Sequence, residues 1–131
     1  MDRRLRDHFD YILEEVLAAM PQRIQKLVEE VPLVVDDYPS DDVMEKTKVR
    51  HRGQLCGLYT GIPLTERSIW QSGTLPDRIM IYREGILNAA EDQYGHVTPD
   101  SLRDQIRITV LHELGHHHGL DEDDLRKLGY G

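Results

Sequence analysis

The feature that most constrains the fold is a long helix near the end of the sequence. Thr98 can cap its first turn, and Pro99 suits the first helical position. Gly119 is typical of a helix end. The helix between them would have about 20 residues and a length of roughly 30 Å. Because apolar residues cover most of its circumference, we expect it to be central and buried. These residues are Ile106, Ile108, Val110, Leu111 and Leu114.

The remaining face of this helix is polar and carries Gln105, Thr109, His112 and His116. His112 and His116 are four residues apart, so they lie on one face about 40° apart around the axis. Two imidazoles at this spacing can bind one zinc ion without bending the backbone. Glu113 lies beside them, where it can take a proton from a metal-bound water without being a ligand. The pattern H-E-x-x-H therefore predicts His112 and His116 as metal ligands and Glu113 as the catalytic residue.

A catalytic zinc ion usually has three protein ligands and one open position. Few residues follow His116 in this sequence, so we expect the third ligand close behind the helix. In the pattern H-E-x-x-H-x-x-G-x-x-H, a glycine turn returns a ligand three residues after the glycine. That position is Glu122, which we predict as the third metal ligand. Asp121 is the alternative, although it also suits the N-cap of a last short helix.

Length and charge narrow the class of protein. A chain of 131 residues is expected to form a single domain over residues 1–131. Its net charge of −8 gives no general attraction to phosphate backbones, so nucleic acid is not an expected partner. The single cysteine, Cys56, allows no internal disulfide, and we expect it to be a small buried apolar residue. Neither a signal peptide nor an apolar run of about 18 residues is seen, so we expect a cytoplasmic protein without membrane contact. The oligomeric state is not indicated.

Hydrophobic periodicity predicts the remaining elements. Apolar residues at helical spacing favour one helix over Leu5–Met20 and a second that continues to about Val31. Strands are expected at Leu33–Asp36, Leu55–Thr60 and Arg78–Arg83. A helical turn is expected at Asp41–Lys46, an irregular loop at Leu64–Gly73, and a short helix or turn at Glu84–Tyr94.

Three stretches of the sequence resemble a known family, the small bacterial zincin-like domain, a minimal zinc-metallopeptidase-like family. They are Gly57–Arg67, Leu75–Ile79, and His112–Glu122 followed by Leu125 and Leu128–Tyr130. The resemblance covers nearly the whole chain, and its last block is the specific one. It implies an α+β fold, in which a small β-sheet packs against a central active-site helix with N-terminal and C-terminal helices.

The same resemblance implies zinc as the cofactor and a peptide or protein as the substrate. Its ligand set would be His112, His116 and an acidic residue after Gly119, with Glu113 as the base. Family members often carry Asp where this chain has Glu122, so the carboxylate is kept on a longer arm. The implied reaction is peptide hydrolysis, in which zinc polarises the carbonyl and activates water while Glu113 carries the proton.

In zincins an edge strand of the sheet binds extended substrate by β-addition. The segment Arg78–Arg83 is our candidate for this strand. Tyr59 and Tyr82 are our candidates for stabilising the oxyanion.

Two other functions fit the metal pattern. A small bacterial RNA-processing family carries H-G-x-L-H-L-x-G-Y-D-H, whose ligand positions coincide with His112, His116 and Glu122, which suggests a metal-dependent ribonuclease. Glu113 in place of glycine and the acidic charge argue against it. The third hypothesis is a binding module stabilised by zinc, without peptidase activity. A structural site has no need of a base such as Glu113 and usually closes with a fourth ligand, for which His117 and His118 are the neighbouring candidates.

Overall fold

Three strands form one small sheet: β1 (Leu33–Asp36), β2 (Gly57–Thr60) and β3 (Arg78–Tyr82). The computed structural model describes residues 1–61, 77–119 and 123, and within them the strand order is β1-β3-β2. The central strand, β3, is parallel to β1 and antiparallel to β2. The prediction of an edge strand at Arg78–Arg83 is therefore wrong, because both sides of β3 are already hydrogen-bonded. Strand β2 lies at an edge of the described sheet.

The predicted central helix is α5 (Pro99–His117), which has 19 residues. Its start is fixed by a reciprocal cap, because Thr98 Oγ1 accepts from the Ser101 N–H at 3.0 Å and Ser101 Oγ accepts from the Thr98 N–H at 2.9 Å. After the last turn, Gly119 takes a left-handed conformation with φ of 82°, which glycine adopts without steric cost. Both predicted ends of this helix are confirmed.

The other helices also follow the predicted pattern. Along α1, the residues Phe9, Ile12, Leu13 and Val16 are buried, which confirms the apolar stripe. The bounds are α1 (Arg3–Ala19), α2 (Gln22–Glu30), α3 (Asp41–Thr47), the 3₁₀ turn η1 (Arg52–Gln54) and α4 (Arg83–Ala89). None of the helices that the structure describes combines the length and apolar character needed to cross a membrane.

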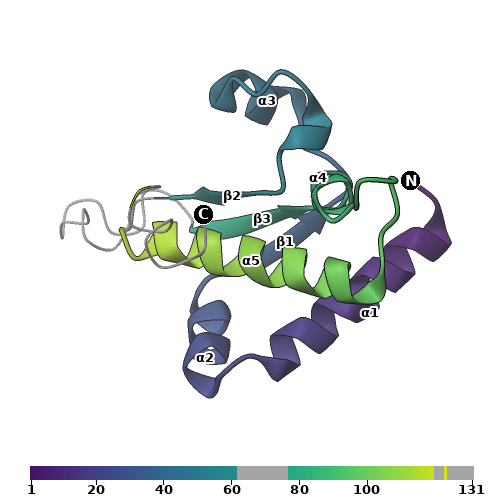
Figure 1. The fold of residues 1–131 in the computed structure, drawn as a ribbon. Coiled ribbons are helices and arrows are strands. Elements are labelled where there is room, and N and C mark those ends of the chain that lie inside the picture. The colour runs from purple at the N-terminus through teal and green to yellow at the C-terminus, as the bar shows by residue number, and fades with distance from the viewer. Residues whose placement is uncertain (62–76, 120–122, 124–131) are drawn as a thin grey trace.

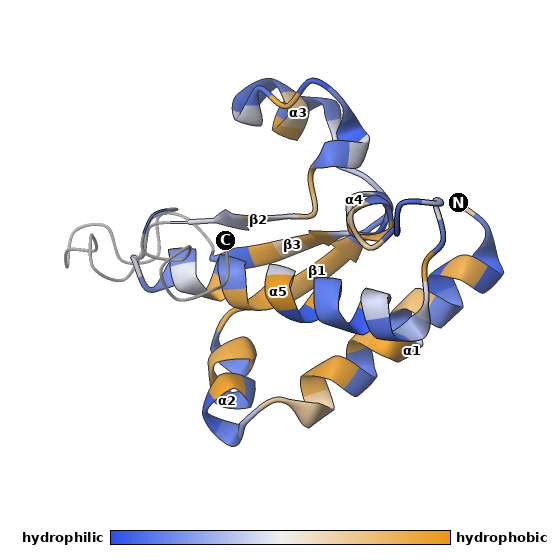
Figure 2. Cartoon of the chain, in the orientation of Figure 1, coloured by the Kyte–Doolittle hydropathy of each residue, from blue (hydrophilic) through white to orange (hydrophobic). Residues whose placement is uncertain are grey.

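The core lies between the sheet, α5 and α1. Helix α5 runs along the sheet and contacts β2 and β3, while α1 packs against α5 from the other side (Figure 1). One core cluster contains Ile79 and Ile81 of β3, Phe9 of α1, and Ile106 and Val110 of α5, and all five are fully buried. Figure 2 shows apolar residues on β1 and β3 and along α1 and α2. This packing fixes α5 against one face of the sheet.

The opposite face of the sheet is less covered. Along β1, Val34 and Asp36 alternate outward and are exposed. Arg78, Met80 and Tyr82 of β3 face the same side, where they line a pocket of about 430 Å³ together with α3. The described residues thus form an α+β domain with a small sheet against a central helix, as expected.

Candidate metal centre

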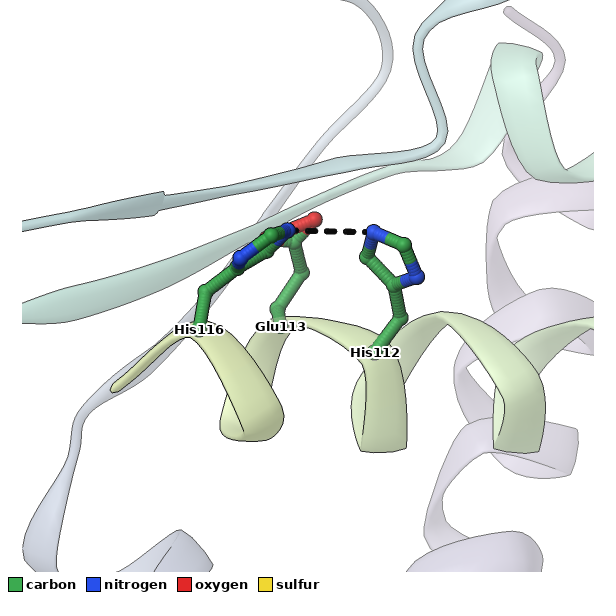
Figure 3. A group of neighbouring side chains, drawn as sticks. All are labelled: His112, Glu113 and His116. Carbon is green, nitrogen blue, oxygen red and sulfur yellow. Dashed lines mark hydrogen bonds between the residues drawn. The ribbon is translucent and has the colours of Figure 1, made fainter. Parts of the chain in front are cut away.

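His112 and His116 lie on the same side of α5, and their rings lean toward each other (Figure 3). Their Nε2 atoms are 3.1 Å apart and their ring centroids 4.8 Å apart. Two nitrogen ligands on one tetrahedral zinc ion, each about 2.0–2.1 Å from the metal, would be separated by about 3.3 Å. Both side chains are partly buried, so they are held by the fold yet accessible. The pair therefore fits a single bound zinc ion.

Glu113 completes a compact group with the two histidines. One carboxylate oxygen and one ring nitrogen of each histidine all lie within 4.8 Å of one another. Metal ligands in proteins are mostly His, Cys, Asp and Glu side chains. Among the residues that the structure describes, His112, Glu113 and His116 are the group of such side chains close enough together to hold one metal ion. Their geometry is that of two ligands with a carboxylate beside them.

The Glu113 carboxylate lies at the outer edge of β2. The Tyr59 backbone N–H donates to Glu113 Oε2 at 2.9 Å. In an antiparallel pair, successive residues turn their N–H and C=O groups alternately toward and away from the partner. Cys56 accepts from the Tyr82 N–H at 2.9 Å, so residues 57 and 59 turn theirs away from β3. The candidate base is therefore bound to the side of β2 that pairs with no other strand of the described sheet.

Glu113 belongs to a buried polar stripe that faces the sheet. Thr109, Glu113 and His117 recur every four residues along α5, with 5%, 6% and 3% of their surface exposed. Thr109 was expected on the histidine face that borders a cleft, but it is buried. It packs instead against Gly57, where a Cβ atom would lie 2.9 Å from Thr109 Cγ2. Because Gly57 has no side chain, α5 approaches β2 closely enough for Glu113 to reach the strand edge.

A second polar cluster joins the end of α5 to the sheet. The Tyr59 hydroxyl donates to Asp77 Oδ1 at 3.1 Å and lies 3.3 Å from His117 Nδ1. His117 Nδ1 is also 3.7 Å from Asp77 Oδ2. Sequence reasoning missed this cluster, and considered His117 only as a spare metal ligand. The four-residue spacing of His117 from Glu113 was the available signal, since it puts both residues on the sheet-facing side.

The family is decided by a comparison of the sequence. Residues 28–131 match the family model of zincin-like metallopeptidases. The chain belongs to the zincin-like metallopeptidase family. No curated protein matches the sequence. Membership in this family indicates a zinc-dependent peptidase and implies a bound metal, typically zinc, which the His112 and His116 pair fits by its distance.

The other predicted site residues of this zincin-like domain have different outcomes. Glu122 and its alternative Asp121 lie outside the described residues, so Glu122 as the third ligand stays a prediction. Tyr82 is wrongly predicted near the reaction, because it is buried and faces the pocket beside α3. Tyr59 is close to Glu113, but its hydroxyl is turned to Asp77 and His117.

Cys56 neighbours the buried polar stripe, and its surroundings favour the thiol over the thiolate. It packs partly buried against the core, close to its predicted role as an apolar residue. Burial raises the pKa of its thiol, and the negative charge of Glu113 raises it further, while a hydrogen bond with Thr109 acts in the opposite direction. The thiol therefore stays protonated and inert at neutral pH. The described site offers carboxylate and imidazole chemistry rather than thiolate chemistry.

Proposed function

We propose that this protein is a zinc-dependent peptidase in which His112, His116 and Glu122 hold the metal and Glu113 is the general base. The observation that carries the proposal is the convergence of the two Nε2 atoms, 3.1 Å apart, with Glu113 beside them at the outer edge of β2 in the described sheet. A bound zinc ion would polarise the substrate carbonyl and lower the pKa of a coordinated water toward about 7. A purely structural metal site would have no use for a carboxylate in this position.

Glu113 has the task of moving one proton. As water adds to the peptide carbonyl carbon, Glu113 accepts the proton that the water loses. When the C–N bond breaks, the same carboxyl group delivers that proton to the leaving amine. The hydrogen bond from the Tyr59 N–H engages Oε2, so the carboxylate is held in one orientation while a lone pair remains for the proton. Because only 6% of the residue is exposed, competing water is kept away from it.

The substrate is proposed to bind as an extended peptide beside β2, in place of the earlier candidate β3. Within the described residues, strand β2 is hydrogen-bonded to β3 along one side only. Its residues 57 and 59 turn their backbone groups to the other side, where the Tyr59 N–H already binds Glu113. A peptide added there would run past Glu113, which is bound to the same strand edge. Backbone pairing of this kind selects for an unstructured segment rather than for one side chain.

The proposal is tested by measuring cleavage of a mixture of unstructured peptides by mass spectrometry, with single-stranded RNA assayed in parallel. We expect the zinc-loaded protein to cleave peptides, to lose this activity after chelation and to regain it when zinc is returned. RNA should stay intact. Metal-dependent cleavage of RNA would favour the ribonuclease instead. A fully zinc-loaded protein that cleaves no peptide would favour the zinc-stabilised binding module.

A further inference from the structure

Tyr59 contacts the stripe on α5 at two points, one from its backbone and one from its side chain. Its N–H donates to Glu113 Oε2 at 2.9 Å, and its hydroxyl lies 3.3 Å from His117 Nδ1. Glu113 and His117 are one helical turn apart on the sheet-facing side of α5. Tyr59 therefore contacts both the candidate base and the C-terminal turn of the helix that carries this base.

The hydroxyl is fixed on its other side by Asp77. It donates to Asp77 Oδ1 at 3.1 Å, so its oxygen is left to accept from the Nδ1–H of His117. The rings of Tyr59 and His117 also meet edge to face, with centroids 5.4 Å apart. His117 is almost fully buried, with 3% of its surface exposed. In such a setting each hydrogen bond constrains the geometry more than it would in water.

We propose that Tyr59 is a positioning residue for Glu113, and this inference rests on the proposed function. The backbone amide holds one carboxylate oxygen, and the phenol, anchored by Asp77 and His117, holds the amide in place. The anchor is needed because β2 has four residues and is paired on one side only within the described sheet. Such an edge strand frays easily. Gly57, the first residue of β2, has no side chain that could bind the strand to α5.

The contact can be tested without any activity, by hydrogen exchange of single backbone amides measured by NMR. The outward amide of Tyr59 should exchange slowly in the wild type, because Glu113 binds it. In Glu113→Ala we expect exchange at residue 59 to become at least about 10-fold faster, while the inward amides of Leu58 and Thr60 are unchanged. Glu113→Gln keeps a neutral hydrogen-bond acceptor, so its exchange rate at residue 59 should lie between those of the wild type and Glu113→Ala. This variant replaces Glu113→Ala in the test if the alanine variant does not fold. Equal exchange at residue 59 in wild type and variants would overturn the inference.

The role of the phenol is tested with Tyr59→Phe, which keeps the backbone amide and the ring. Tyr82→Phe is the matched control, because it removes a buried phenol from the neighbouring strand on the face away from α5. We expect Tyr59→Phe to keep its zinc, to speed exchange at residue 59 and to lower kcat about 10-fold with KM changed less than about 2-fold, since the base is misplaced while the substrate still binds.

Tyr82→Phe should change neither kcat nor the exchange at residue 59. If Tyr59→Phe lowers kcat no more than Tyr82→Phe and leaves the exchange at residue 59 unchanged, the phenol has no positioning role. The two proposals fail separately. A wild-type protein without peptidase activity contradicts the proposed function, whereas the exchange pattern still decides whether Tyr59 holds Glu113.

Discussion

Thr109 of α5 packs directly onto Gly57 of β2, where a Cβ atom would lie 2.9 Å from Thr109 Cγ2 and 2.9 Å from the Met80 carbonyl oxygen. We therefore expect Gly57→Val to lower the free energy of unfolding by about 1–3 kcal/mol, as is typical of overpacked sites. Denaturant titration would measure it. Thr109→Ser, which removes Cγ2, should recover part of the loss in the double variant. A Gly57→Val protein as stable as the wild type would show that the two elements can separate at no cost.

The two histidines should account for the bound metal. We expect one zinc ion per chain in the wild type and none in the His112→Ala, His116→Ala double variant, because the Nε2 pair that fits the ion is gone. Elemental mass spectrometry gives the stoichiometry. The double variant at the exposed histidines His8 and His96 is the matched control and should keep its zinc. Full zinc occupancy without His112 and His116 would rule this site out.

The third ligand is predicted from the spacing after Gly119. We expect Glu122→Ala to weaken zinc affinity far more than Asp121→Ala, because loss of a ligand costs more than loss of a helix cap. Competition with a chelator of known affinity would measure both variants. If Asp121→Ala loses the metal and Glu122→Ala keeps it, the third ligand is Asp121.

Local signals predicted most of the elements. The ends of α5 follow from Thr98, Pro99 and Gly119, whose preferences act within one turn of the helix. The shared face of His112 and His116 follows from helical periodicity alone. These features need no knowledge of the remainder of the fold, and the structure has them where the sequence predicted them.

Features that depend on long-range pairing were not predictable. The central position of β3 is decided by hydrogen bonds to two strands distant in sequence, so the alternating pattern of Arg78–Arg83 looked equally suited to an edge. The burial of Thr109 was not predicted because it depends on Gly57, about 50 residues earlier in the chain. The contacts of Tyr59 with Glu113, Asp77 and His117 likewise join separate elements.

An ion-pair cluster outside the candidate metal centre should make stability depend on pH. Arg6 and Arg83 both bind Asp37, and hydrogen bonds from these guanidinium groups hold the pKa of its carboxyl below the ordinary value of 3.8, against the opposing effect of burial. The charged form is thus favoured in the folded state. Its stabilisation is present above about pH 3.8 and is lost as the pH falls through the lowered pKa.

We therefore expect Asp37→Asn to lower Tm at pH 7, with the difference from the wild type shrinking as the pH falls below about 3.8. Thermal melts across this range would measure it. Asp100→Asn is the control, since the Asp100 side chain is 92% exposed in its pair with Arg103 and should matter little at any pH. A difference between wild type and Asp37→Asn that stays constant down to pH 2 would contradict the assignment.

The most direct test of the account is the peptidase activity of zinc-loaded Glu113→Gln, measured beside its zinc content. Glutamine keeps the size of the side chain and an acceptor for the Tyr59 N–H, but it cannot take up a proton. We expect a full zinc site, an unchanged fold and at least ~100-fold less peptide hydrolysis than in the wild type, the usual scale for a general base. Equal cleavage by wild type and Glu113→Gln would contradict the assignment of Glu113 as the base.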